Sequence, residues 1–297
     1  MRVNPNFAPD ILNDVFQSQA QEQTDLQELS TGRRVNLPSD DPTAFAADVQ
    51  NQAEQSQTDQ YLTNTTNLEG LFQTADSTMS SVVSALNQAI SLGTEGSNGT
   101  LTLAQQQALA QQVQGIQSQM LQYANTSYEG SYIFGGTETT KPPFVADVTQ
   151  VAGVSYQGNA GVNQVEIANG RSIQTNLPGS QIFLGSGGNV MASLQQLVNA
   201  LSSGNTSAIG TATTAISASL NYVSTQRVFY GSALDQMNSN QSYLQTEEVN
   251  LQTQDSGLVA ADMTAVATDL SQATTTHDAA LAALAKVIPN SLLNYLQ

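Results

Sequence analysis

The side chains that most often carry enzyme chemistry are scarce in this chain of 297 residues. It contains no Cys and one His, which excludes disulfides, thiolate metal sites and thiol catalysis and leaves little for a His-centred triad. His277 lies beside Asp278 on an apolar face of a predicted helix, and no Ser or Thr stands out as a nucleophile that it could activate. We therefore interpret His277 as a structural residue.

The acidic and glycine-rich segments define no site either. Asp40 and Asp41 are adjacent, as are Glu247 and Glu248, but a glycosidase needs two carboxylates held about 5–10 Å apart across a cleft, and no feature selects such a pair. The Gly-Ser-Gly-Gly at 185–188 lacks the Lys-Ser/Thr of a phosphate-binding loop, and there is no Asp-rich calcium loop. The sequence predicts a non-enzymatic protein without cofactor or metal.

The charge balance excludes further classes of partner. Seven Lys and Arg stand against 24 Asp and Glu, a net charge of −17, so nucleic acid and anionic lipid would be repelled. No apolar run reaches the roughly 18 residues of a membrane span, and the residues after Met1 lack the apolar segment of a cleaved secretory signal. These features fit a cytoplasmic protein or one exported by a route that reads no such signal.

Long helices are the elements that the sequence predicts most strongly. Residues 43–141 and 179–288 contain no Pro, and their apolar residues alternate at spacings of three and four, which is typical of coiled-coil helices. A Gly-rich break at 93–99 predicts that the first stretch folds as an antiparallel hairpin. The predicted seams are Leu68, Phe72, Ala75, Met79, Val82, Leu86 and Ala89; then Leu109, Val113, Ile116, Met120, Tyr123 and Ser127; then Ile209, Thr213, Ile216, Leu220, Val223, Arg227, Tyr230, Leu234, Met237, Gln241, Leu244, Glu248 and Leu251.

The polar members of the last seam have two interpretations. Thr213, Arg227, Gln241 and Glu248 either occupy positions at the solvent edge, or they fix the register of the helices or await a partner. The sequence leaves both open.

Residues 131–188 break the helical pattern. Short β-prone runs alternate with turn pairs such as Gly158-Asn159 and Asn169-Gly170, and Asn-Gly between apolar runs is a hairpin signal. We expect a small antiparallel β domain inserted into a helical rod, with 185–188 as its exit loop and the Tyr132/Phe134 cluster in its core. The runs expected as strands are Tyr132–Phe134, Val154–Tyr156, Val162–Ile167 and Gln181–Leu184.

The two chain ends carry apolar stripes with little to pack against. Burying the four large apolar residues of 8–31 yields about 8 kcal/mol, whereas ordering some 20 residues costs on the order of 20–40 kcal/mol. We therefore expect both ends to be largely disordered in a free monomer and helical after assembly. The candidate subunit contacts are Leu12, Val15, Leu26 and Leu29 at one end, and Val266, Leu270, Leu281 and Leu284 at the other.

Residues 30–42 predict a corner between two helices. Gly32 can end the first helix, where Arg33 and Arg34 meet its dipole, and Ser39 or Asp40 can cap the next helix with Pro42 in its first turn. The corner alone is one interpretation. The other adds pairing of the two arginines with acids of a neighbouring subunit, so that replacing both by Glu would block assembly and spare the melting temperature. The candidate contacts here are Gly32, Arg33, Arg34, Asn36, Asp40 and Asp41.

These thirteen residues resemble the N-terminal signature of the flagellin superfamily, in the form that its hook–filament junction members carry. Their sequence is Ser-Thr-Gly-Arg-Arg-Val-Asn-Leu-Pro-Ser-Asp-Asp-Pro. The segment 130–137 with 142–144 is similar to that family's entry into a β domain. Arg227, Gly231 and Leu234 resemble a pattern in the family's third long helix. Pro289 departs from the family pattern, and we expect it to kink or end the last helix.

The resemblance implies a mainly α fold, a coiled-coil rod built from both terminal segments with a small inserted antiparallel β domain. The expected divisions are 1–42 (assembly helix and corner), 43–130 (hairpin), 131–188 (β domain), 189–255 (long rod helix) and 256–297 (C-terminal assembly helix).

The implied function is that of a structural flagellar subunit at the hook–filament junction, exported unfolded through the type III apparatus and located outside the cell. The implied partners are further copies of the chain, a neighbouring hook-associated protein, flagellin and an export chaperone. The alternatives are a flagellin filament subunit, a surface adhesin that binds carbohydrate and, for an enzyme, a hydrolase.

Overall fold

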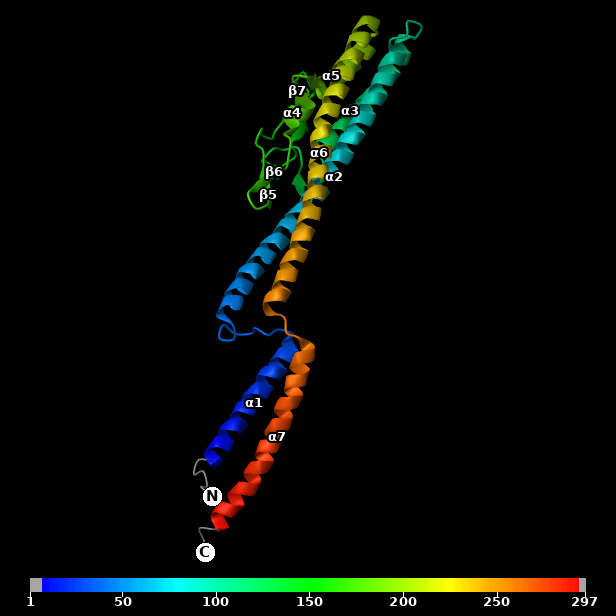
Figure 1. Cartoon of the computed structure of the whole chain (residues 1–297). Helices are drawn as coiled ribbons and strands as arrows, with labels where there is room; N and C mark the ends of the chain where they lie inside the picture. The colour runs from blue at the N-terminus through cyan, green and yellow to red at the C-terminus, as the bar shows by residue number, and fades with distance from the viewer. Residues whose placement is uncertain (1–6, 294–297) are drawn as a thin grey trace. The chain divides into compact units, whose positions relative to one another are not determined.

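The computed structural model describes the backbone of residues 7–293 and the side chains of residues 12–285. The chain forms two compact units, Met1–Gln57 with Glu247–Gln297, and Thr58–Thr246. In the described part the helices are α1 (Phe7–Thr31), α2 (Pro42–Gly96), α3 (Leu103–Ala124), α4 (Gly179–Phe183), α5 (Val190–Ser203), α6 (Thr206–Val259) and α7 (Met263–Leu293) (Figure 1).

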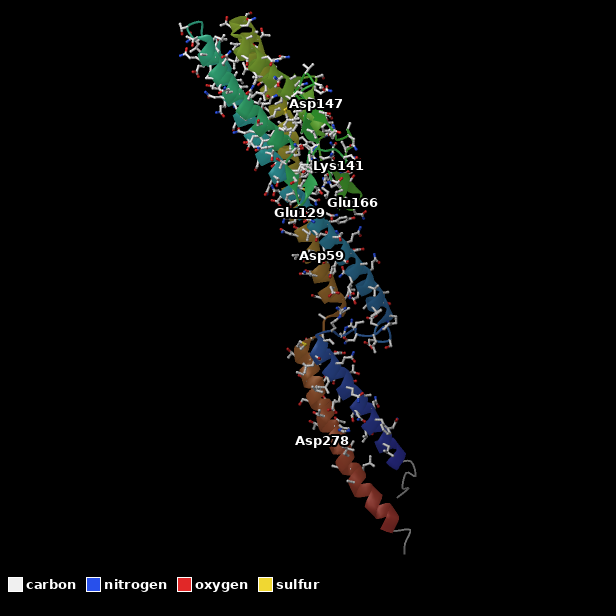
Figure 2. All side chains as sticks on the ribbon, turned by 180° about the vertical axis from the view of Figure 1, so that it is seen from behind. Asp59, Glu129, Lys141, Asp147, Glu166 and Asp278 are labelled. Carbon is white, nitrogen blue, oxygen red and sulfur yellow. The ribbon has the colours of Figure 1, made fainter. Side chains whose placement is uncertain are left out.

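The strands form four separate antiparallel pairs, all between α3 and α5. The pairs are β1 (Ser127–Tyr128) with β2 (Ser131–Tyr132), β3 (Phe144–Ala146) with β4 (Val154–Tyr156), β5 (Gln164–Ala168) with β6 (Arg171–Gln174), and β7 (Leu184–Gly185) with β8 (Gly188–Asn189). The predicted fold class, long helices with a small inserted antiparallel β region, is therefore confirmed. The charged side chains Lys141, Asp147 and Glu166 project from this inserted region (Figure 2).

The break between α2 and α3 is confirmed, but it begins later than predicted. Helix α2 continues through Gly93 and ends at Gly96. A Cβ atom at Gly93 would collide with Thr213, and one at Gly96 with Leu201, so these two glycines allow close helix packing and leave the turn to residues 97–102. The capping box of Thr102 and Gln105 then starts α3.

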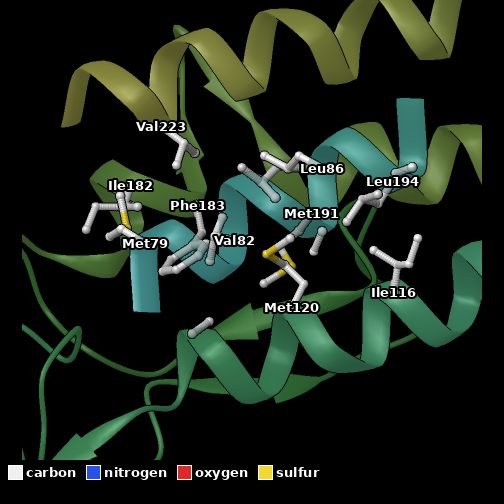
Figure 3. Packing of buried hydrophobic residues seen from close by; sticks show 14 of the residues in the cluster. Met79, Val82, Leu86, Ile116, Met120, Ile182, Phe183, Met191, Leu194 and Val223 are labelled. Carbon is white, nitrogen blue, oxygen red and sulfur yellow. The ribbon is translucent and has the colours of Figure 1, made fainter. Parts of the chain in front are cut away.

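The core of the unit 58–246 is built from the predicted seams of α2 and α3. All seven predicted residues of α2 are buried, as are the first four of α3, whereas Tyr123 is half-buried and Ser127 lies beyond the helix. Figure 3 shows the centre of this core, where four helices and the short α4 contribute Met79, Val82, Leu86, Ile116, Met120, Ile182, Phe183, Met191, Leu194 and Val223.

Seven of the thirteen residues predicted for the α6 seam are buried, and at four of the other six the buried residue lies one position earlier. The residues spaced by seven from Ile209 to Leu251 are all buried. Between them, however, the buried positions are Ala212, Ser219, Ala233 and Asn240, each one residue before the predicted Thr213, Leu220, Leu234 and Gln241, which are half-buried. Short side chains let the neighbouring helices approach closely, and the larger or more polar ones remain at the edge of the contact.

Arg227 combines both interpretations of the polar seam residues. It lies half-buried at the edge of α6, and its guanidinium binds both carboxylate oxygens of Asp76 on α2, with Nε to Oδ1 at 2.7 Å and Nη2 to Oδ2 at 2.9 Å. A bidentate pair of this kind fixes the relative register of two helices.

Replacing Arg227 by Gln is expected to lower the free energy of unfolding by about 0.5–1 kcal/mol, since both partners are partly exposed and screened by water. A double-mutant cycle with Asp76→Asn in urea measures the coupling. Arg171→Gln, which removes an exposed charge on the β5–β6 hairpin, should change little. A coupling energy of zero would show that the pair fixes no register.

The inserted region corrects several strand predictions. The run Gln181–Leu184 is not a strand: it forms the end of helix α4 and the start of β7. The helix places the Phe183 ring in the core, where it packs edge-on against Phe134 and Phe144 with 5.4 Å between ring centroids in both cases. Asn169-Gly170 forms the predicted hairpin between β5 and β6, with Gly170 at φ +67°. Gly158-Asn159 forms none, since the Asn159 side chain instead accepts hydrogen bonds from the backbone of Thr137 and Gly161.

The remaining expectations for this region hold in part. Of the first run, Tyr132–Phe134, only Tyr132 is in a strand, as the end of β2; it is half-buried, and Phe134 beyond it is fully buried. Strand β5 begins at Gln164 rather than Val162. The segment 185–188 is a tight hairpin between β7 and β8. In the last helix, Pro289 is not an end point, because α7 continues to Leu293.

Candidate functional site: the corner and the terminal helices

The corner is built on Gly32, as predicted. Its φ of +69° suits glycine, and its N–H donates to the carbonyl oxygen of Glu28 at 2.8 Å, which closes the last turn of α1. The chain then pairs with the segment between α6 and α7: the Arg34 N–H donates to the Val259 oxygen at 2.7 Å, and the Ala261 N–H to the Gly32 oxygen at 2.9 Å. A small apolar core of Val35, Ala44 and Val259, with Phe45 and Leu258 against it, lies beside this pairing.

The acids of the corner hold its backbone. The Asp40 carboxylate accepts the N–H of Leu37 at 2.8 Å and of Asn36 at 3.0 Å, and these hydrogen bonds lower the pKa of Asp40. The prediction that Ser39 or Asp40 caps α2 is wrong. Asp41 is the cap, with Oδ1 accepting the N–H of Ala44 at 3.0 Å and of Thr43 at 3.2 Å, because Pro42 occupies the first helical position and the cap must precede it.

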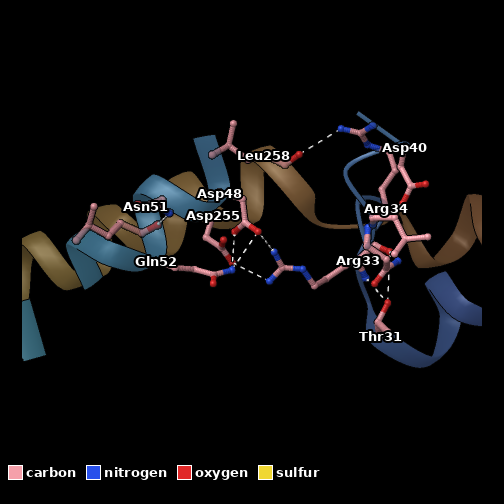
Figure 4. Close-up of polar contacts among 12 residues, drawn as sticks. Thr31, Arg33, Arg34, Asp40, Asp48, Asn51, Gln52, Asp255 and Leu258 are labelled. Atoms are coloured by element: carbon pink, nitrogen blue, oxygen red, sulfur yellow. Dashed lines mark hydrogen bonds and ion pairs between the residues drawn. The ribbon is translucent and has the colours of Figure 1, made fainter. Parts of the chain in front are cut away.

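The arginines of the corner have partners within their own chain (Figure 4). Arg33 Nη2 lies 2.5 Å from Oδ2 of the buried Asp48, and its Nη1 lies 3.8 Å from Oδ2 of Asp255. Arg34 Nη2 donates to the Leu258 oxygen at 3.2 Å and lies 3.6 Å from Asp41 Oδ2. Sequence reasoning missed Asp48 and Asp255, since nothing in their local pattern marks two acids of separate helices as partners of Arg33.

All six predicted corner residues thus take part in one well-connected loop. The Asn36 amide belongs to it as well, donating to the Arg33 oxygen at 2.6 Å. The interpretation as a helix corner is confirmed, and pairing with acids of a neighbouring subunit stays a prediction. Since Arg33 and Arg34 are engaged internally, the expectation that charge reversal spares the melting temperature has to be revised.

Replacing Arg33 and Arg34 together by Glu is expected to lower the stability of the corner by about 2–3 kcal/mol, somewhat less than for a fully buried ion pair. The new carboxylates would stand against Asp48, Asp255 and Asp41, so assembly should fail together with the fold. Thermal unfolding followed by circular dichroism measures the first effect, and Arg171→Glu serves as the control. An unchanged melting temperature with failed assembly would instead favour pairing between subunits.

Helices α1 and α7 lie side by side in Figure 1 and pack along their length. The face of α1 that is buried consists of Val15, Ser18 and Asp25, and that of α7 of Val266 and Ala273. Leu270, His277 and Leu284 continue the α7 face half-buried. Only one of the four predicted α1 contacts, Val15, is therefore covered inside the chain.

The large apolar side chains of α1 face solvent instead. Leu12 is 44% exposed, Leu26 48% and Leu29 37%. Phe16, which the heptad pattern did not include, is 64% exposed, and on α7 Leu281 is 45% exposed. These five residues, called the terminal apolar surface below, are available to other protein chains.

Apart from Val15, the α1 side of the contact with α7 is polar and acidic. Asp25 is buried, with Oδ1 accepting from the Gln21 amide at 2.8 Å and Oδ2 without a partner. Burial and then the charge of Asp25 raise the pKa of Glu28. Residues 12–31 and 263–285 include no Lys or Arg to offset their acids, which are Asp14, Glu22, Asp25, Glu28, Asp269 and Asp278.

The described residues include neither a cluster of metal ligands nor a membrane-spanning helix. They contain no group of three or more His, Cys, Asp and Glu side chains placed to hold a metal ion, and no helix among them is both long enough and apolar enough to cross a bilayer. A groove of about 660 Å³ runs between α1 and α7, lined by Asp14, Gln17, Ser18, Gln21, Asp269, Gln272, Ala273, Thr276, Ala279 and Ala280.

Comparisons with known proteins agree with this picture. Residues 6–139 match the bacterial flagellin N-terminal helical region, and residues 213–296 match the bacterial flagellin C-terminal helical region. Flagellar hook-associated protein 3 of Salmonella typhimurium is 32% identical over 173 residues, which is 58% of this chain and 53% of that protein. The chain thus matches about half the length of this relative.

Two solved structures share the fold. FlgL of Xanthomonas campestris superposes with a TM-score of 0.60 and 16% identity, over 69% of this chain and 98% of that one. FlgL of Bacillus cereus superposes with a TM-score of 0.59 and 21% identity, over 71% of this chain and 99% of that one.

Proposed function

The chain belongs to the bacterial flagellin family, and from that premise we propose that it is a structural, non-enzymatic subunit of the flagellum at the junction between hook and filament. Its copies form a short layer through α1 and α7. A hook-associated protein lies on one side of this layer and flagellin on the other. The names of its relatives, hook-associated protein 3 and FlgL, support the junction over the filament itself.

The terminal apolar surface is the observation that carries the proposal. A lone chain buries Val15, Ser18 and Asp25 of α1 and leaves the larger Leu12, Phe16 and Leu26 in water. Exposed apolar side chains grouped on one element are typical of a surface that other chains cover. An enzyme would not need such a surface, whereas a subunit that assembles through its terminal helices does.

Export and location follow from the same proposal. The chain leaves the cell unfolded through the flagellar type III apparatus, aided by an export chaperone, and folds at the growing tip. The absence of Cys is compatible with passage between compartments of different redox state. The structure describes α1 and α7 as a packed pair of helices, and the disorder of the two ends before assembly stays a prediction.

Two experiments test the proposal. A strain that lacks the gene should make hooks without filaments and shed flagellin into the medium; normal filaments would contradict the junction role. Purified chain added to the ends of isolated hooks should form a short layer and stop. Continued growth would instead indicate a filament subunit, and glycan binding by a chain unable to assemble would indicate the adhesin.

A further inference from the structure

The corner contains two acids of different helices under one arginine. Asp48 on α2 and Asp255 on α6 lie close enough to shift each other's pKa, and both lie within reach of Arg33. The side chain of Asp48 is 4% exposed and that of Asp255 is 26% exposed. A hydrogen bond between two carboxyl groups requires a proton on one of them, because two carboxylates have only acceptors.

The hydrogen bonds indicate which acid holds the proton. Asp48 is surrounded by donors: Arg33 Nη2 at 2.5 Å, and the Gln52 amide at 3.0 Å from both of its oxygens. Asp255 Oδ1 is buried, and no donor in the described structure reaches it. The ionised form therefore suits Asp48, and the protonated form suits Asp255.

Among the residues whose side chains the structure describes, Arg33 is the cation that pairs with these two acids. The charged groups that act on Asp255 are Arg33 and Asp48, and those that act on Asp48 are Arg33 and Asp255. With both acids ionised, the cluster would carry one uncompensated negative charge in a partly buried site. One proton removes that charge and leaves a neutral cluster of arginine, carboxylate and carboxylic acid.

We propose that Asp48 and Asp255 share one proton under Arg33, and that this proton makes the attachment of residues 32–35 to the α6–α7 connection dependent on pH. The proton holds α2, α6 and the corner segment around one guanidinium. Loss of the proton places two carboxylates against each other and loosens Arg33, next to the backbone bonds of Arg34 with Val259 and of Ala261 with Gly32.

The sign of the pH dependence follows from the two acids. Burial and the contact with Asp48 raise the pKa of Asp255, so its stabilisation is present at low pH and is lost as the pH rises through that raised pKa. Burial also acts to raise the pKa of Asp48, but its contacts with Asp255, Arg33 and Gln52 outweigh burial and lower it. The contribution of Asp48 is lost as the pH falls through that lowered pKa. The attachment is strongest between the two values.

Amide hydrogen exchange of the Arg34 and Ala261 N–H groups in the full chain tests the proposal, since both bonds belong to the attachment. Above the usual Asp pKa of about 3.9, opening should increase by up to about tenfold per pH unit until the raised pKa of Asp255 is passed, and then level off. Asp255→Asn, which stays neutral and can still donate to Asp48, should remove this dependence.

Asp59→Asn is the matched control, since it removes one negative charge from an exposed site on α2 (Figure 2) and should keep the wild-type profile. A direct carboxyl-carbon NMR titration of the wild-type chain needs no variant. The measured quantity is the opening constant, which is the exchange rate divided by the intrinsic rate at the same pH. An opening constant that does not change with pH in the wild type, an unchanged pH dependence in Asp255→Asn, or an ordinary titration of Asp255 would each overturn the proposal.

Discussion

Replacing Leu12, Phe16 and Leu26 together by Gln is expected to abolish assembly at ordinary concentrations while the monomer keeps its stability. The three side chains are 44%, 64% and 48% exposed, so little of their surface contributes to the fold of a single chain. Burying the exposed part of each against a neighbour contributes on the order of 1 kcal/mol. The critical concentration for polymerisation should therefore increase on the order of 100-fold.

Sedimentation of the purified chain measures the critical concentration. The free energy of unfolding of the monomer, measured by thermal unfolding, should change by no more than about 0.5 kcal/mol per site. The control replaces Val145, Val148 and Val151 of the β3–β4 hairpin by Gln, which are 47%, 97% and 80% exposed. Both variants remove three exposed apolar side chains, but only the first lies on the terminal helices. An equal loss of assembly in the control would mean that exposed apolar area in general drives association.

Replacing Phe72 by Ala is expected to give the largest loss of stability, about 3–5 kcal/mol. Phe72 is fully buried on α2, and its ring lies 6.4 Å from that of Phe229 and 6.3 Å from that of Tyr230 on α6. The substitution leaves a cavity between two long helices that neither can fill by moving a single side chain.

Urea unfolding followed by circular dichroism measures this loss, because the chain has no Trp to report by fluorescence. Phe16→Ala is the matched control: the same atoms are removed from a side chain that is 64% exposed, so stability should change by about 0.5 kcal/mol or less. A loss below about 1 kcal/mol for Phe72→Ala would show that the core can close around the missing ring.

The sequence predicted helices well and helix faces less well. All seven residues that the spacing of three and four selected on α2 are buried, because α2 is covered by large side chains from several elements. In α6 the same spacing was ambiguous between neighbouring positions. The choice of Ser219 over Leu220, or Asn240 over Gln241, depends on how closely the facing helices approach, which no local pattern records.

The candidate site was predicted in its location but not in its contacts. The unusual segment 30–42 marked the corner and the amphipathic ends marked α1 and α7, yet Phe16 was missed because it lies outside the heptad pattern. The cap was placed too early because Ser, Asp and Asp follow one another before Pro42. Asp48 and Asp255 lie far from Arg33 in the sequence, and ion pairs between distant segments leave no periodic signal.

The composition of the α1 face that contacts α7 affects how easily the two helices separate. Because α1 buries Val15, Ser18 and Asp25 there and leaves its larger apolar side chains exposed, α1 exposes little further apolar surface when the two helices separate. Separation also spares the large core of residues 58–246, whose buried residues all come from other elements. We therefore expect α1 and α7 to separate from each other, and to pack against the same helices of other copies, with a small loss of free energy while the rest of the molecule stays folded.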